Sequence, residues 1–413
     1  MLIVALVMMA MLTSTASGME PIRHRALRGH QIWQLSGDGG AVSFELMQKG
    51  LMDVLGHSRT SRKVRVPSRA LEEARRILQE RGVAHEVLVE DLATFLEEKE
   101  RLARGSVERE SCFPNSCPRP FGNSYMTFKQ IEWFLQNLCE NSTRASLTSL
   151  GKSTENRDIW MVHLRSEGPK AGGAIWVEAG IHAREWISSA VALHLLKNLL
   201  QDDGTAGHPD VYVVPMANPD GYEYSRTLDR FWRKNRRRAS NPECMGVDLN
   251  RNWGFHYGVG ASDFECSEVF KGAAAFSEPE TKALRDAMKK VKDNLKMVLS
   301  LHSYGQQLLY PWGYSEEETA PDTDDLIKAG NVFVEAIKNL SNTSYAVANV
   351  ARDLYKASGT TEDWAKSVLG VKYTYTLELR DEGENGFLLD PSHILPCSEE
   401  VWEGLKVLLQ RIF

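Results

Sequence analysis

One stretch, IWVEAGIHAREW at residues 175–186, constrains the fold of this chain more than any other. Its apolar run over residues 175–179, interrupted by one glutamate, is typical of a buried strand, and Gly180 ends that strand. A helix is expected to follow from Glu185. His182 and Glu185 therefore lie three residues apart at a strand end, where one imidazole and one carboxylate can bind the same metal ion. Because His-x-x-Glu is common by chance, a third ligand is needed before the stretch indicates a metal site.

The composition is that of a soluble globular protein, with 42% hydrophobic and 25% charged residues among 413. This length predicts one large domain and a smaller one. A net charge of −6 argues against a nucleic-acid partner.

Residues 2–12 are uninterrupted apolar residues, too short a run to span a bilayer, and small polar residues follow them. This pattern predicts a signal peptide over residues 1–18 and a secreted protein. Because no basic residue precedes the run, a buried N-terminal segment is the alternative. No other stretch is long enough for a membrane helix, so no membrane partner is expected.

The cysteines are even in number, and all lie beyond residue 110. In a secreted chain this predicts disulfides, and the spacing is not that of a zinc ribbon. The six are Cys112, Cys117, Cys139, Cys244, Cys266 and Cys397. Three sequons, starting at Asn141, Asn339 and Asn342, predict glycosylation.

Residues 19–109 contain no cysteine and alternate between short strands and helices, which predicts a small α/β sandwich. One of the expected helices covers residues 42–55, where apolar residues form a stripe. The segment ends in EEKERLARGSVERE, a charged linker in which Arg104 and Arg109 are accessible to a trypsin-like protease. A propeptide with its cleavage site is one interpretation, and a solvated helix with a linker is the other.

From residue 121 onward, strands alternate with helices. The pattern predicts a mixed, mostly parallel twisted sheet that is covered by helices on both faces. A strand over residues 211–216 is expected to lead into a turn at NPDGY, residues 218–222. Functional sites in such sheets lie at the carboxyl ends of strands.

Two further predicted strands end in side chains that can bind a metal ion or transfer a proton. His302 directly follows a predicted strand and, with His182 and Glu185, makes the two-histidine, one-glutamate set of a catalytic zinc site. Glu378 ends another apolar strand, where a carboxylate can act as a general base beside a metal ion. A salt bridge from Glu378 to Arg380 is an equally good interpretation of that residue alone.

Two loops add polar groups. FWRKNRRR, residues 231–238, is the strongest basic run; in a secreted acidic chain it does not indicate nucleic-acid binding, and one of its arginines can stabilise an oxyanion. GVDLNRNW, residues 246–253, supplies Asn250 and Arg251, a hydrogen-bond donor and a fork that binds carboxylates.

These stretches together resemble the zinc metallocarboxypeptidases of the pancreatic A and B type. The matching motifs are HAREW, NPDGY, FWRKNR, GVDLNRNW, LHSYGQQLLYPWGY, LYKASGTTEDW and ELRDEG, in the family's order over residues from about 120 to 413. The resemblance implies a zymogen with an activation propeptide over 19–109 and a catalytic domain over 110–413. It also implies one Zn²⁺ per chain, peptide or protein C termini as substrates, and a trypsin-like activating protease.

The resemblance assigns roles to the residues around the metal. His182, Glu185 and His302 match the zinc ligands, and Asp248 matches a carboxylate that orients the first histidine. Hydrolysis of the terminal peptide bond is the implied reaction.

Other matches concern catalysis and the end of the substrate. Glu378 matches the general base and acid, and Arg233 matches the group that polarises the scissile carbonyl. Asn250, Arg251 and Tyr355 match the side chains that bind the terminal carboxylate, which explains removal of the last residue only.

Substrate preference depends on Glu362, which occupies the position that faces the floor of the specificity pocket. A-type enzymes carry an apolar residue there and B-type enzymes an aspartate. A carboxylate predicts a preference for C-terminal Lys or Arg; because glutamate is longer, an A-like preference for apolar or aromatic residues is the alternative. Arg184 and Tyr304 match residues that line the next subsites.

The resemblance also implies a Cys244–Cys266 disulfide and a cis peptide between Ser303 and Tyr304. Two other functions agree less well with the sequence. A catalytically inactive peptide-binding homologue is disfavoured by the complete set of ligands and catalytic groups. A zinc amidohydrolase that acts on small acylated molecules is disfavoured by the carboxylate-binding residues and the propeptide.

Overall fold

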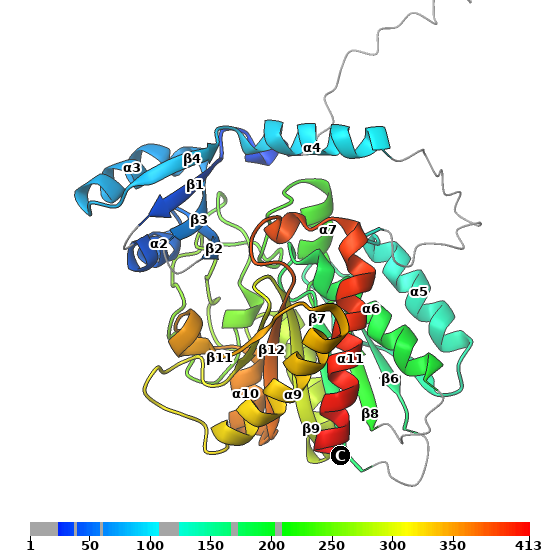
Figure 1. Ribbon diagram of the computed structural model, residues 1–413. Helices are drawn as coiled ribbons and strands as arrows, with labels where there is room; N and C mark the ends of the chain where they lie inside the picture. Colours follow the sequence, from blue (N-terminus) through cyan, green and yellow to red (C-terminus); the bar gives the residue numbers. More distant parts are fainter. Residues whose placement is uncertain (1–23, 37–38, 58–60, 107–123, 167–171, 203–208) are drawn as a thin grey trace, which may run out of the picture.

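The computed structural model describes residues 24–36, 39–57, 61–106, 124–166, 172–202 and 209–413. The expected signal peptide, Arg109, Cys112 and Cys117 lie outside the described residues. Figure 1 shows two units: a small N-terminal domain, residues 24–106, which lies over one end of a large domain that begins at residue 124.

The N-terminal domain is the predicted small α/β sandwich. Its four strands pair antiparallel in the order β2-β3-β1-β4, and α2 and α3 bury Leu46 and Leu78 against Trp33 and Val64 of the sheet. The strands are β1 (Gln31–Ser36), β2 (Asp53–His57), β3 (Ser61–Val66) and β4 (His85–Val89). The helices are η1 (Arg25–Leu27), α2 (Gly39–Gln48), η2 (Ser68–Ala70), α3 (Leu71–Glu80) and α4 (Leu92–Ser106), with Arg104 in the last turn of α4.

The helix predicted over residues 42–55 is wrong in its second half. The helix ends at Gln48, and β2 begins at Asp53. Gly50 ends it with a φ of 68°, and a Cβ at that position would lie 2.9 Å from the Phe264 ring. The apolar pattern continues past the helix because β2 buries Leu55 as well.

The large domain is built on an eight-stranded mixed sheet in the order β11-β10-β12-β9-β7-β8-β6-β5, as the strand and helix alternation predicts. Four pairings are parallel, and the antiparallel pairings are β10–β12, β5–β6 and β6–β8. The strands are β5 (Ala145–Lys152), β6 (Asp158–Leu164), β7 (Ala174–Ala179), β8 (Asp210–Val214), β9 (Leu295–Ser303), β10 (Gln307–Tyr310), β11 (Ala346–Asn349) and β12 (Tyr373–Leu379).

Helices cover both faces of this sheet. One face packs on α5, α6, α9 and α11, and the opposite face on α8 and α10. Side chains along β7 alternate between the two cores, with Ile175 in the first and Trp176 in the second. The α-helices are α5 (Phe128–Glu140), α6 (Trp186–Gln201), α7 (Pro219–Thr227), α8 (Pro279–Val291), α9 (Thr323–Ser341), α10 (Thr361–Leu369) and α11 (Ile394–Ile412). Short helical turns are η3 (Leu249–Arg251), η4 (Lys292–Asn294), η5 (Val350–Leu354), η6 (Gly386–Leu388) and η7 (Pro391–His393).

The expected turn at NPDGY is the start of a helix. Asn218 is the N-cap of α7, and its side chain accepts a hydrogen bond from the Gly221 amide at 3.0 Å. Pro219 occupies the first helical position, where its missing N–H costs nothing. The turn residues therefore predict the change of direction correctly, but the chain continues as a helix and not as a loop.

Covalent and surface features agree in part with expectation. Cys244 and Cys266 are bonded, with their Cα atoms 4.7 Å apart, as the resemblance implied. Cys139 and Cys397 are free thiols. Among the described helices, none is both long enough and apolar enough to cross a membrane.

We expect Asn218→Ala to destabilise the large domain by about 2–4 kcal/mol, because it removes a cap and leaves buried carbonyls unsatisfied. The Asn218 amide also donates to the Ile181 and Lys234 carbonyls, at 3.2 and 3.1 Å. Urea unfolding measures the change. Asn241→Ala, at an exposed position, is the matched control, and equal losses in the two variants would contradict the assignment.

Candidate active site

The pairing of three parallel strands positions the site. β9 lies between β7 and β12, and the register places His302 level with Glu378 on β12. On the other side, Ala179 at the end of β7 is level with Leu301. His302, Glu378 and the loop that follows Ala179 therefore meet at one edge of the sheet, as expected for the carboxyl ends of parallel strands.

A tight turn after β7 presents the next two groups. Gly180 has a φ of 66°, and a Cβ there would lie 2.7 Å from the Ser189 hydroxyl and 2.9 Å from the Met216 sulfur, so this position requires glycine. His182 follows the turn, and Glu185 is the N-cap residue of α6. The Ala183 amide donates a hydrogen bond to the Arg233 carbonyl at 3.0 Å. This bond fixes the loop against the basic segment, residues 231–238.

The three predicted ligands converge. Nδ1 of His182 lies 3.1 Å from Nδ1 of His302 and 2.8 Å from Oε1 of Glu185, and Nδ1 of His302 lies 3.1 Å from Oε2 of Glu185. All three side chains are buried, and their ligand atoms lie within 4.8 Å of one another. Two imidazole nitrogens and one carboxylate facing a common point are the donor set of a catalytic zinc site, so these residues fit the metal.

Each imidazole has a partner for its second nitrogen. Nε2 of His182 lies 3.2 Å from Oδ1 of Asp248, and Nε2 of His302 lies 3.0 Å from the Ser300 hydroxyl. Ser300 in turn donates to Glu178 at 3.1 Å, and Glu178 is fully buried between β7 and β9. Such partners fix the tautomer and the orientation of metal-binding histidines.

Sequence reasoning missed Ser300 and Glu178. For Ser300 the signal was present, because it lies two residues before His302 on the same strand and therefore shares its face. Glu178 is then paired with Ser300 in the register of β7 and β9. In the sequence alone, Glu178 stands out only as an interruption of the apolar run.

Asp248 also holds Arg233. Its Oδ2 accepts hydrogen bonds from Nε and Nη2 of Arg233, at 3.1 and 2.9 Å. The pKa of the Asp248 carboxyl is therefore well below its usual range: burial opposes ionisation, but Arg233 and His182 outweigh burial. One carboxylate thus fixes both the His182 imidazole and the Arg233 guanidinium beside it.

The two glutamates at the site are placed in different electrostatic environments. Burial opposes ionisation of Glu185, but the imidazoles of His182 and His302 hold the pKa of that carboxyl well below its usual range. Burial, assisted by Glu185 and Glu362, raises the pKa of Glu378 to about 8. A cation bound by the three ligands would bring the Glu378 pKa down, so this carboxyl can exchange a proton near neutral pH.

A second group of predicted residues gathers beside η3. The Arg251 guanidinium is buried, donates to the Asn250 carbonyl at 2.7 Å, and lies 3.5 Å from the Tyr355 hydroxyl. The Asn250 side-chain oxygen accepts from the Thr361 amide at 3.1 Å, which ties this group to the start of α10. The structure therefore brings Asn250, Arg251 and Tyr355 together.

Glu362, in the first turn of α10, is 2% exposed. Its Oε2 has no hydrogen-bond partner among the described residues, nor have the hydroxyls of Thr374 and Thr376 on β12, against which α10 packs. Glu362 also lies close enough to His302 and Glu378 to affect their pKa values. The Glu362 carboxylate is thus buried and incompletely satisfied in the neighbourhood of His302 and Glu378.

The N-terminal domain covers Arg184 and Tyr304. Nη1 of Arg184 donates to Oδ2 of Asp53 at 2.5 Å, and the Tyr304 hydroxyl donates to the Leu55 carbonyl. The Phe44 ring lies 5.9 Å from the Tyr355 ring. The peptide between Ser303 and Tyr304 is cis, as expected.

Further groups around Arg184 were not identified from the sequence. Arg230 donates to the carbonyls of Arg184 and Phe387, and its guanidinium stacks on Trp186, 3.6 Å from the ring centroid. Burial lowers the pKa of Arg230 to about 9. Its only sequence signal was its position just before FWRKNRRR.

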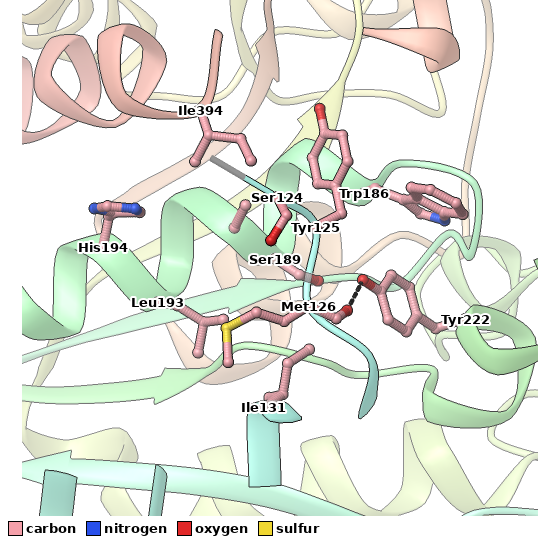
Figure 2. Close-up of a pocket in the computed structure, with 11 residues that line it drawn as sticks. Ser124, Tyr125, Met126, Ile131, Trp186, Ser189, Leu193, His194, Tyr222 and Ile394 are labelled. Atoms are coloured by element: carbon pink, nitrogen blue, oxygen red, sulfur yellow. Dashed lines mark hydrogen bonds between the residues drawn. The ribbon is translucent and has the colours of Figure 1, made fainter. Parts of the chain in front are cut away.

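A separate small pocket of about 20 Å³ lies between residues 124–126, α6 and the start of α11 (Figure 2). The Tyr222 hydroxyl donates to the Met126 carbonyl at 2.6 Å and holds the first segment in place. None of the predicted site residues lines this pocket.

Comparison with known proteins agrees with this geometry. Residues 131–404 match the family model described as "Zinc carboxypeptidase". Mouse carboxypeptidase A4 is 36% identical over 357 residues, 84% of this chain and 83% of that relative. Carboxypeptidase B of the crayfish Astacus astacus is 38% identical over 292 residues, 69% of this chain and 96% of that relative.

Solved structures extend the similarity to the N-terminal domain. Carboxypeptidase A from Helicoverpa armigera superposes with a TM-score of 0.83 at 28% identity and covers 94% of this chain and 98% of its own. Thrombin-activatable fibrinolysis inhibitor gives a TM-score of 0.75 at 27% identity, covering 93% and 99%. From its sequence, its fold and its two-histidine, one-glutamate site, this chain belongs to the zinc carboxypeptidase family and is a metallopeptidase of the A/B type.

Proposed function

We propose that this chain is the secreted zymogen of a zinc carboxypeptidase that prefers C-terminal Lys or Arg. The observation that supports it is the placement of Glu362 beside the metal ligands, with the carboxylate-binding group around Arg251 on one side and the N-terminal domain over the other. In this proposal His182, Glu185 and His302 hold one Zn²⁺.

Bound zinc would supply Lewis acidity, which polarises the scissile carbonyl and makes water more acidic. The chain's own residues do the rest. Glu378 accepts the proton of the attacking water and passes it to the leaving amine. Arg233, held by Asp248, donates to the carbonyl oxygen as negative charge develops on it.

The Arg251 group supports cleavage of the last residue only. The Arg251 Nε is buried and has no partner among the described residues. A substrate's terminal carboxylate can pair with this guanidinium and with Asn250 and Tyr355. An internal peptide carries no such charge and would leave the arginine unpaired, which is costly in a buried site.

Glu362 supports the basic preference. A buried carboxylate oxygen without a partner is unfavourable, and a Lys or Arg side chain of the substrate would supply the missing cation. The same carboxylate would repel acidic side chains. A-type preference is the competing outcome, since both A-type and B-type carboxypeptidases are among the relatives.

The N-terminal domain accounts for latency. It covers Arg184, Tyr304 and Tyr355, which the proposal assigns to substrate binding. Cleavage near Arg104 or Arg109 by a trypsin-like protease would separate this domain, residues 19–109, from the catalytic domain. Secretion and a signal peptide over residues 1–18 belong to the same proposal.

Activation is the direct test of function. We expect the intact protein to release almost nothing, and the trypsin-treated protein to release single C-terminal residues from peptides that end in Arg or Lys faster than from those that end in Phe, Leu or Glu. Mass spectrometry of the products measures both results. No release from any peptide, with zinc bound and the N-terminal domain removed, would show an inactive peptide-binding homologue instead.

Glu362→Gln tests the specificity. The change keeps the shape and removes the charge, so we expect kcat/KM for Arg-ended peptides to fall by roughly 30-fold, or about 2 kcal/mol, relative to Phe-ended peptides. Glu335→Gln, at an exposed position on α9, is the matched control. An unchanged Arg-to-Phe ratio in the Glu362 variant would rule out this residue as the determinant.

Metal binding is tested by zinc content. We expect about one Zn²⁺ per chain in the wild type, and loss of peptide hydrolysis on chelation with recovery when Zn²⁺ is returned. His302→Ala should weaken zinc binding by more than the roughly 10- to 100-fold typical of an outer-shell partner. His393→Ala, which lies at the start of α11, serves as control; full zinc retention by His302→Ala would contradict the ligand assignment.

A further inference from the structure

We propose that Asp229 and Glu268, the acidic pair, form a subsite in the processed enzyme for a basic side chain that lies upstream of the scissile bond in the substrate. This inference rests on the proposed function, because it concerns the chain that remains after the N-terminal domain is removed. It adds a preference for a basic side chain upstream of the scissile bond to the preference for a basic C-terminal residue that Glu362 would give.

The acidic pair already binds a cation. Arg65, on β3 of the N-terminal domain, places Nη1 3.2 Å from Oδ2 of Asp229 and Nη2 2.8 Å from Oε1 of Glu268. The Arg65 side chain is 4% exposed. Two carboxylates of the large domain therefore enclose a guanidinium that the N-terminal domain supplies. Because a cationic side chain is bound there, we take the ligand class to be Arg or Lys.

The backbone holds one of the two carboxylates independently of Arg65. Oδ1 of Asp229 accepts a hydrogen bond from the Phe231 amide at 2.9 Å, so the backbone fixes this side chain. Oε2 of Glu268 is buried with no partner among the described residues. Removal of the N-terminal domain would take away Arg65 and leave two neighbouring anions at the surface, and another cation would offset their mutual repulsion.

Three cations of the large domain also act on the acidic pair: Arg236 acts on Asp229, and Lys234 and Arg184 act on Glu268. The Lys234 ammonium donates to the Glu265 carbonyl at 2.8 Å, and Arg184 is paired with Asp53 in the zymogen. With the N-terminal domain in place, Arg65 and none of these three cations bridges the two carboxylates, and the proposal assigns that place to a substrate cation once the domain is removed.

The position relative to the cleft fits an upstream residue. Oδ2 of Asp53 joins the two sites, lying 2.5 Å from Nη1 of Arg184 and 3.4 Å from Nη2 of Arg65. Arg184 also donates to the Phe231 carbonyl at 3.3 Å, two residues from Asp229. A substrate whose last residue lies at Arg251 and Glu362 must run past Arg184 to leave the cleft, and its next side chains then reach the acidic pair.

The test uses the trypsin-processed, zinc-loaded enzyme and peptides with one fixed C-terminal residue. Arg or its neutral isostere citrulline is placed in turn at the second, third and fourth residues before the scissile bond. We expect the ratio of kcat/KM for Arg over citrulline to reach about tenfold at one position in the wild type. Glu268→Gln and Asp229→Asn should each lower that ratio toward one.

The ratio separates the charge effect from any general loss of activity, since both peptides use the same enzyme. Asp293→Asn, whose side chain is 90% exposed at the opposite end of β9, should keep the wild-type ratio. A ratio near one at all three positions, with the peptides still cleaved, would show that the acidic pair serves only to dock Arg65. A tenfold ratio that survives both substitutions would also overturn the proposal, and no cleavage of any peptide would overturn the proposed function with it.

Discussion

The register of three neighbouring parallel strands is the constraint on which the site depends. β9 pairs with β7 on one side and with β12 on the other, so His302 is level with Glu378 and just beyond the end of β7. Because side chains alternate along a strand, a slip of one residue would turn His302 to the opposite core. The same register places Ser300 against Glu178, and hydrogen bonds of 3.1 and 3.0 Å then connect Glu178 through Ser300 to the His302 ring. Packing of the two cores therefore fixes the positions of His302 and Glu378 at this edge of the sheet.

Shared acceptors connect the loops to this edge. Asp248 binds His182 and Arg233 at once, so a shift of the basic segment would also move a metal ligand. Buried ions of this kind are stable only in pairs, and losing one partner leaves an uncompensated charge. The same rule applies at the interface of the two domains, where Asp53 bridges Arg184 and Arg65. Replacing a charged residue of one domain at this interface would therefore leave its partner in the other domain without a compensating charge.

Pattern and spacing predicted the residues at or just beyond the carboxyl ends of strands: His182, Glu185, His302 and Glu378 were found this way, together with the sheet class. Residues on loops were not accessible to that reasoning. Asp248, Arg233 and Asn250 were assigned through the resemblance to a family, because the position of a loop depends on contacts distant in sequence. Asp229, Glu268 and Glu178 were not singled out at all, since an isolated acidic residue carries no signal until its partner is known. The second half of the 42–55 helix failed because a buried strand can continue the apolar pattern of the helix before it.

The hydrogen bonds and ion pairs of the N-terminal domain fall on one part of the candidate site. Among the described residues, no hydrogen bond joins that domain to the Arg251 guanidinium, whose partners are Asn250 and Tyr355. It instead contacts Arg184, Tyr304 and the acidic pair. If this domain is an activation propeptide, as proposed, it inhibits by covering the path of the substrate chain and not the pocket for its last residue. Because the domain neutralises the charged groups along that path, its removal exposes polar groups whose best replacement partners are the charges of a substrate.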